Sequence, residues 1–191
     1  MFAAAFGGVD ERVWRFFIDH PFLVSFAKVY TRWGVVSVLT PLALAVGVAI
    51  FVKTKTATLA AIPMLALQVN CIATAELKSW FNVARPPREF WLTGAGHGSF
   101  PSGHTANTTA LVIAIALVLG VLTGSRSVQR AIYFTAGLLV SLMGWSRLAL
   151  NVHWFSDVVA GWILGSIAAL LTSSILMKLT KSAPTRQTRW S

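Results

Sequence analysis

Charged residues are scarce in this chain, and acidic ones are scarcer still. Only 12% of the 191 residues are charged, with 6 Asp or Glu against 16 Lys or Arg, while 55% are hydrophobic. Soluble domains carry roughly 25% charge, so this composition indicates an integral membrane protein. The net charge of +10 would suit nucleic-acid binding only if the basic residues formed a stripe among exposed aromatics. They lie instead in short gaps between apolar runs, so we expect a bilayer and no nucleic acid as partner.

Two further features are nearly or wholly missing. Cys71 is the only cysteine, which excludes an intrachain disulfide and a cysteine-based zinc site. The first residues lack the basic start and long apolar core of a cleavable signal peptide. Insertion into the membrane is therefore expected to depend on the internal apolar segments.

Five apolar runs are long enough to cross a bilayer, which takes about 20 helical residues. They cover about 35–52, 57–77, 105–122, 131–150 and 158–177. Backbone groups in lipid must be satisfied within the segment, so we predict an all-α, polytopic membrane helix bundle. Residues 9–33 mix charges, aromatics and Pro21, which is typical of an interfacial amphipathic helix or a pair of them. The expected division is an amphipathic segment 1–34, a transmembrane domain 35–178 and a basic tail 179–191.

Basic residues alternate between the gaps and predict which side each gap faces. Lys53 and Lys55 lie in the first gap, Arg126 and Arg130 in the third, and the basic tail follows the last span. Positively charged loops favour the cytoplasm, so these regions, including the C-terminus, are expected there. The gaps at about 78–104 and 146–157 then face outward.

Ionisable residues near the spans gather on this outward side. They are Lys78, Arg85, Arg88, His104, Arg147, His153 and Asp157. Ionisable groups at membrane depth are costly, and each suggests a functional role. Three segments that are distant in sequence are therefore expected to form one site.

His153 and Asp157 are the first candidates for chemistry. If a helix runs from Val152 onward, the two side chains are four residues apart and share a face. A carboxylate bonded to one imidazole nitrogen fixes the tautomer and raises the basicity of the other, which prepares a nucleophile. On its own, the pair would be equally compatible with a purely stabilising contact.

The segment from Phe100 to Thr105 precedes an apolar helix and predicts an anion site. Ser102 or a neighbour can cap the helix, and Gly103 lets the backbone approach a ligand closely. The free N–H groups of a helix start bind phosphate well. His104 beside them is placed to donate a proton to a leaving oxygen. Taken alone, however, such a segment is more often an ordinary helix cap.

Lys78 and Arg85, with Arg147, supply about three positive charges, which suits a dianionic phosphate. Pro86 and Pro87 end any helix there and fix how Arg85 enters the site. In isolation, a lysine at the end of a span is more often an interface anchor. His97, in the same loop, is expected to be a solvated histidine.

Together these spacings resemble the type 2 phosphatidic acid phosphatase family over roughly residues 35–178. Its three motifs are Lys-x6-Arg-Pro, Pro-Ser-Gly-His and Ser-Arg-x5-His-x3-Asp, matched by Lys78, Arg85 and Pro86, by residues 101–104, and by Ser146, Arg147, His153 and Asp157. Membrane members usually have six spans, and the first of these has no counterpart among the five runs here.

The resemblance implies a phosphatase that needs no metal or cofactor and works through a phosphohistidine. In it, His153 attacks phosphorus, Asp157 orients His153 and His104 protonates the leaving group. The phosphoryl oxygens are bound by Lys78, Arg85, Ser102, Gly103 and Arg147.

We therefore expect a lipid phosphatase in the inner (plasma) membrane with an outward-facing site. Undecaprenyl diphosphate, phosphatidic acid, phosphatidylglycerol phosphate and a lipid A phosphate are candidate substrates. The alternative is a non-catalytic protein that binds or transports lipid phosphates. A haloperoxidase shares the phosphate-pocket pattern, but those enzymes are soluble and far longer.

Overall fold

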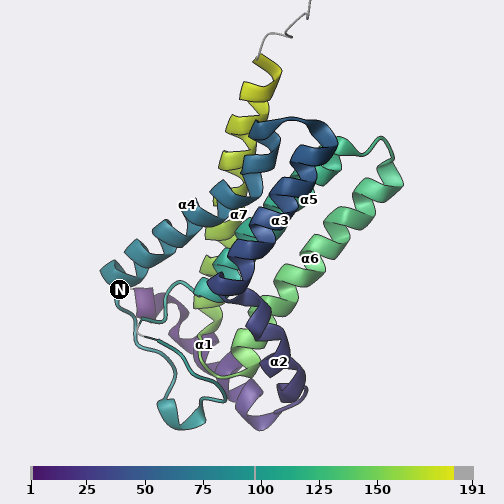
Figure 1. The fold of residues 1–191 in the computed structure, drawn as a ribbon. Helices are drawn as coiled ribbons and strands as arrows, with labels where there is room; N and C mark the ends of the chain where they lie inside the picture. The colour runs from purple at the N-terminus through teal and green to yellow at the C-terminus, as the bar shows by residue number, and fades with distance from the viewer. Residues whose placement is uncertain (1, 97, 183–191) are drawn as a thin grey trace, which may run out of the picture.

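The computed structural model describes residues 2–96 and 98–182, and helices account for every regular element in those ranges (Figure 1). In chain order they are α1 (Phe2–Asp19), α2 (Val24–Tyr30), the 3₁₀ helix η1 (Thr31–Gly34), α3 (Val36–Thr54), α4 (Ala57–Phe81), the 3₁₀ helix η2 (Arg88–Phe90), α5 (Gly103–Leu122), α6 (Arg126–Ala149) and α7 (Phe155–Ser182). The all-α prediction is confirmed. His97 and most of the predicted basic tail, residues 183–191, lie outside the described residues.

Over the described residues, α3, α4, α5, α6 and α7 are the five helices long and apolar enough to cross a membrane. The five predicted spans are thus confirmed, but α6 starts at Arg126 rather than 131, and α7 at Phe155 rather than 158. Hydropathy identifies only the part of a helix that lies in the hydrocarbon layer. The polar first turns of α6 and α7 lie in the hydrated layer, so the apolar runs begin later than the helices. At α6 the Ser125 hydroxyl also caps the start by accepting a hydrogen bond from Val128 N, at 3.5 Å.

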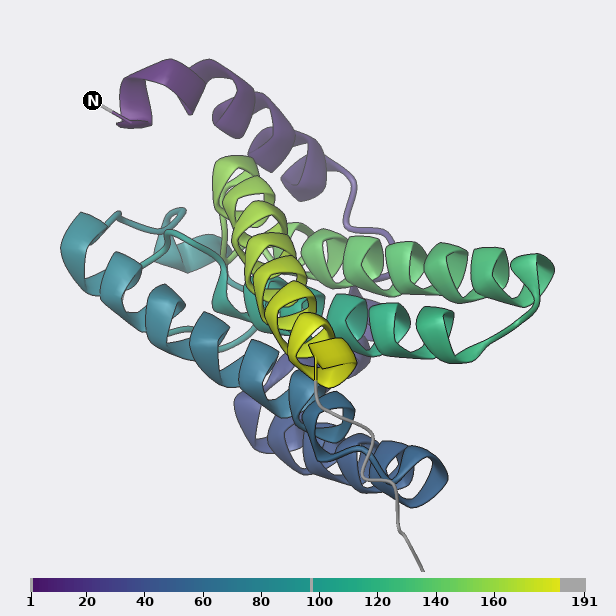
Figure 2. The same ribbon diagram turned by 90° about the horizontal axis from the view of Figure 1, so that it is seen from above.

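The N-terminal segment forms two helices before the first span, as its mixed composition predicts, although α1 begins at Phe2 rather than near residue 9. Phe17 and Val24 pack on a small core made by Ala27, Ala149, Leu150 and Val152. Seen along the bundle, α1 runs beside α7 on the side away from α3 and α4 (Figure 2). The segment therefore covers one end of the bundle without crossing it.

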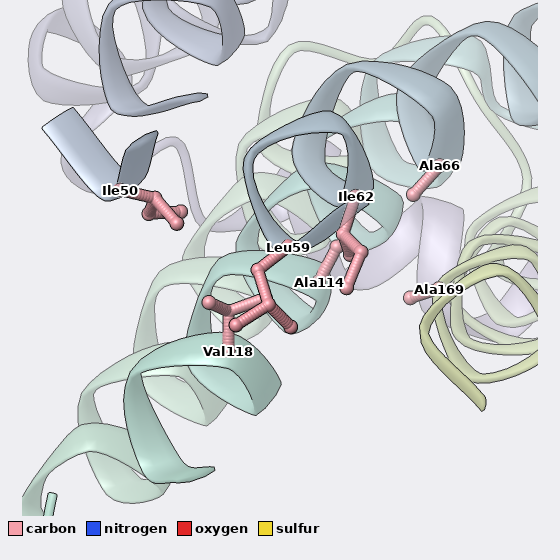
Figure 3. Close-up of a cluster of buried hydrophobic side chains, with 7 residues drawn as sticks. All are labelled: Ile50, Leu59, Ile62, Ala66, Ala114, Val118 and Ala169. Carbon is pink, nitrogen blue, oxygen red and sulfur yellow. The ribbon is translucent and has the colours of Figure 1, made fainter. Parts of the chain in front are cut away.

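The main core lies toward the α3–α4 turn, in the half of the bundle away from α1 and α2. It is formed by Ile50 of α3, Leu59, Ile62 and Ala66 of α4, Ala114 and Val118 of α5, and Ala169 of α7 (Figure 3). Toward the other end, α5 and α7 approach each other through glycines. A Cβ atom on Gly165 would lie 2.4 Å from Ala106 O, and one on Gly161 would lie 3.0 Å from Ser102 O. Small residues permit such close helix contacts in membranes, and here they bring the starts of α5 and α7 together.

Candidate active site

All of the predicted site residues lie at one end of the bundle, where α4 and α6 end and α5 and α7 begin (Figure 1). The α3–α4 and α5–α6 turns, which carry Lys53, Lys55 and Arg126, lie at the opposite end. The predicted convergence of three distant segments is therefore present in the structure.

His153 contacts Asp157, with 3.1 Å between Nδ1 and Oδ2. The two would share a helical face only if a helix ran from Val152 onward. That condition is not met, because α7 begins at Phe155 and His153 lies in the preceding turn. Asn151 has a left-handed backbone there, with φ of 56°, which interrupts the helical path. Asp157 is the third residue of α7 and reaches back to accept a hydrogen bond from Trp154 N at 2.8 Å. This is one half of a capping box, and it aims the carboxylate at His153.

The Oδ2 atom of Asp157 collects three donors. Besides His153 and Trp154, it accepts a hydrogen bond from the Ser99 hydroxyl. Ser99 is fully buried and belongs to the loop before α5. No motif marked Ser99 in the sequence, and its role depends on the loop fold. Together these contacts leave the carboxylate one orientation.

The His153 ring is 3% exposed and is held neutral. Burial, together with the positive charges of Arg147, Arg85 and Lys78, keeps the pKa of His153 well below its usual range. With Asp157 accepting from Nδ1–H, the lone pair of a neutral ring lies on Nε2. Nε2 is 3.1 Å from Nη1 of Arg85. This nitrogen therefore accepts a hydrogen bond from the Arg85 guanidinium, beside which an incoming anion would also lie.

Arg85 ties two loops to the site. Its guanidinium donates to Gly96 O at 2.7 Å, Val152 O at 2.6 Å and Gly98 O at 3.0 Å. Burial lowers the pKa of Arg85 below its usual value, yet a guanidinium remains charged. α4 ends before this residue, at Phe81, because Asn82 adopts a left-handed conformation, with φ of 40°.

Lys78 reaches the start of α5 along one face of α4. Asn70 and Thr74 precede it at intervals of four, and Asn70 Nδ2 donates to Asn107 Oδ1 at 2.6 Å, which ties α4 to α5. The Lys78 ammonium donates to Gly98 O at 2.9 Å and Ser99 O at 3.3 Å. A Cβ on Gly103 would lie 3.7 Å from Lys78 Cε. The ammonium group thus lies beside the N-terminus of α5.

The sequence predicts that Ser102 or a neighbour can cap α5. Ser102 does precede α5, but its side chain makes no capping hydrogen bond. Its hydroxyl accepts a hydrogen bond from Thr105 Oγ1 at 3.0 Å, and its N–H donates to Asp157 O at 3.0 Å. The first-turn N–H groups from Gly103 onward have no partner within the helix. His104 faces η1, where a Cβ on Gly34 would lie 3.0 Å from His104 Cδ2.

Arg147 is the most enclosed of the three cations. It is 2% exposed, and its Nη1 donates to the Thr31 hydroxyl at 2.5 Å. Its Nε has no hydrogen-bond partner among the described residues. Thr31 belongs to η1 and was not singled out from the sequence. A buried guanidinium with an unused donor is suited to binding an anion.

Within residues 2–96 and 98–182, no group of three or more His, Cys, Asp or Glu side chains is arranged to hold a metal ion. The site instead combines three cations, two imidazoles and one oriented carboxylate. Such a set can bind a phosphate dianion, attack it with a ring nitrogen and exchange a proton with it.

Comparison with known proteins agrees with this arrangement. A model of the PAP2 superfamily matches residues 57–181. Phosphatidylglycerophosphatase B of Bacillus subtilis (strain 168) is 30% identical over 167 residues, which cover 86% of this chain and 80% of the relative.

Two solved structures share the fold. The crystal structure of a transmembrane PAP2 type phosphatidylglycerolphosphate phosphatase from Bacillus subtilis has a TM-score of 0.85 and 28% identity, covering 95% of this chain and 93% of the other. That of Aquifex aeolicus LpxE has a TM-score of 0.68 and 26% identity, covering 87% and 95%. With its motifs, its membrane helices and these likenesses in agreement, the chain belongs to the PAP2 superfamily and is a multi-pass membrane phosphatase.

Proposed function

We propose that this protein hydrolyses a lipid phosphate or diphosphate through a phosphohistidine intermediate. The observation that carries the proposal is the neutral, Asp157-bonded His153, whose Nε2 accepts a hydrogen bond from Arg85 of the cationic group. A phosphoryl group bound by Lys78, Arg85 and Arg147 lies within reach of that nitrogen.

In the first step, the Nε2 lone pair of His153 forms a bond to phosphorus and the bond from phosphorus to the lipid oxygen breaks. His104, whose protonated form a bound phosphate dianion favours, gives its proton to that oxygen, so the lipid leaves as an alcohol or a monophosphate. Asp157 keeps the Nδ1 proton in place and stabilises the positive charge that develops on the ring.

In the second step, a water oxygen attacks phosphorus and the bond to Nε2 breaks. His104 takes the proton from the water, which restores both histidines and releases phosphate. The three cations and the N–H groups at the start of α5, from Gly103 onward, hold the phosphoryl oxygens during both steps. Ser102 acts through its backbone by fastening this helix start to Asp157.

A lipid substrate is favoured by where the site lies. It is at the membrane-flanking end of the bundle, beneath the N-terminal helices, with exposed Trp80 and Trp33 nearby. Tryptophans at that level mark the headgroup region. The Bacillus relative is named for phosphatidylglycerophosphate, so we propose phosphatidylglycerol phosphate, phosphatidic acid or undecaprenyl diphosphate as substrate.

The alternative, a protein that only binds or carries lipid phosphates, has no chemical need for an oriented nucleophile. The contacts of Asp157 with His153, Ser99 and Trp154 favour the enzyme. A haloperoxidase is disfavoured, because those enzymes are soluble and this chain has five membrane spans within its described residues.

Purified protein in detergent is expected to release phosphate from at least one of these lipids with EDTA present, because no step requires a metal. The measurement is phosphate release across a panel of the candidate lipids, with and without EDTA. A strict requirement for a divalent ion would contradict the mechanism, and the relative rates would rank the substrates.

We also propose that the site faces outward from the inner membrane and that the C-terminus is cytoplasmic. The basic residues Lys53, Lys55 and Arg126 lie at the end of the bundle opposite the site, and such residues favour the cytoplasm. A green fluorescent protein fused to the C-terminus should fluoresce, and a periplasmic alkaline phosphatase fused there should stay inactive. The reverse pattern would invert the orientation.

A further inference from the structure

Asp10 of α1 makes an unusual contact with the start of α7. Its side chain is 8% exposed, and both of its carboxylate oxygens bond to one residue. Oδ1 accepts from Ser156 N at 2.8 Å, and Oδ2 accepts from the Ser156 hydroxyl at 2.7 Å. Negative charge at a helix N-terminus is stabilising, and hydrogen bonds to a carboxylate are among the stronger ones. A residue from the N-terminal helix thus caps the helix that carries Asp157.

Two carboxylates accept hydrogen bonds from backbone N–H groups at the start of α7. Asp157 accepts from Trp154 N, while Asp10 accepts from Ser156 N. Ser156 directly precedes Asp157 and lies three residues after His153. Any shift of the backbone at Ser156 therefore moves the carboxylate that orients the His153 ring.

A second contact from α1 reaches the same turn. Trp14, one helical turn after Asp10, packs on Trp154 and Phe90 with ring centroids 5.9 Å and 5.3 Å apart. Elsewhere this interface is hollow. A cavity of about 510 Å³ lies between α1 and the segment after α4, with Val83, Pro87 and Asp157 in its wall. Asp10 and Trp14 thus hold α1 against this turn beside the cavity, and Asp10 supplies the hydrogen bonds.

We propose that Asp10 is a positioning residue, which holds the first turn of α7 so that Asp157 keeps His153 aligned for attack. This inference rests on the proposed phosphatase function. Asp10 does not touch the phosphoryl group. Its removal is therefore expected to slow the chemical step while the cationic group still binds phosphate.

The test compares Asp10→Ala with Asp10→Asn in the full-length protein. Asparagine keeps both contacts, because its oxygen accepts from Ser156 N and its amide donates to the Ser156 hydroxyl. Alanine keeps neither. We expect Asp10→Ala to lower kcat by about tenfold to a hundredfold, as a small misplacement of a reacting group does, with KM and competitive inhibition by inorganic phosphate little changed. Asp10→Asn should recover most of kcat.

The matched control is Glu11→Ala, which removes the same charge from the next position on α1. Among the described residues, Glu11 forms an ion pair with Arg15, in an exposed contact. Its loss should leave kcat near that of the wild type. An equal fall in both alanine variants, or an Asp10→Ala variant with wild-type kcat, would overturn the inference.

Ser156→Ala decides the case if Asp10→Ala fails to fold. It deletes the hydroxyl contact and keeps the backbone one, so we expect a loss of kcat that is smaller than the loss expected for Asp10→Ala, with KM little changed. Wild-type kcat in Ser156→Ala would count against the inference. Absence of phosphate release by the wild type would instead overturn the phosphatase proposal.

Discussion

Replacement of His153 by alanine should abolish phosphate release. In the proposed mechanism the imidazole forms the bond to phosphorus, and loss of a catalytic nucleophile costs about 10⁴-fold or more in kcat. The side chain is buried against Asp157, so an alanine leaves a small polar cavity, while Asp157 Oδ2 keeps its hydrogen bonds from Ser99 and Trp154. Initial rates at saturating lipid, and acid-labile phosphate on the protein after rapid quenching, measure the effect.

The matched control is His20→Ala, which makes the same change at an exposed histidine near the end of α1. Its rate should equal that of the wild type. If His153→Ala releases phosphate at a rate close to that of His20→Ala, His153 is not the nucleophile.

The second large effect is expected at Arg147. Removal of one charged donor from a preorganised anion site costs about 10²- to 10³-fold in kcat, and here the donor is 2% exposed, where charge is poorly screened. Arg147→Ala should lose at least this much. Arg147→Lys keeps the charge but not the fork of donors, so it should fall between alanine and the wild type. The assay is phosphate release over a range of lipid concentrations.

Arg126→Ala, at the exposed start of the same helix, provides the comparison. It removes an identical side chain far from the site and should leave kcat unchanged. Activity of Arg147→Ala within a few-fold of Arg126→Ala would show that Arg147 does not bind the phosphoryl group.

Hydropathy predicted the five spans because the thickness of a bilayer imposes a length that the sequence must match. It did not predict where α6 and α7 begin, since a helix continues into the hydrated layer wherever its backbone can be capped. Ser125 does this for α6, and Asp157 with Asp10 does so for α7. The same capping explains why His153 lies before the helix and not on it.

The motif residues were predictable because charged groups next to apolar spans are costly. Several of them on one side of the membrane therefore indicate a shared functional site. Ser99, Thr31 and Asp10 were not predictable, because each is a single polar residue whose partner is distant in sequence. The Asp10 contact spans 146 residues and that of Thr31 spans 116. No local spacing or periodicity encodes such pairs, and only the packing of α1 and η1 on the bundle brings them together.

The glycine contacts between α5 and α7 also bear on how the site can move. Ser102 N is bonded to Asp157 O, and Gly161 and Gly165 bring the two backbones almost into contact. No flexible side chain lies between them to absorb a displacement, and close-packed interiors transmit strain rather than yield. The start of α5, where we propose that phosphate binds, and the carboxylate of Asp157 are therefore expected to move as one body.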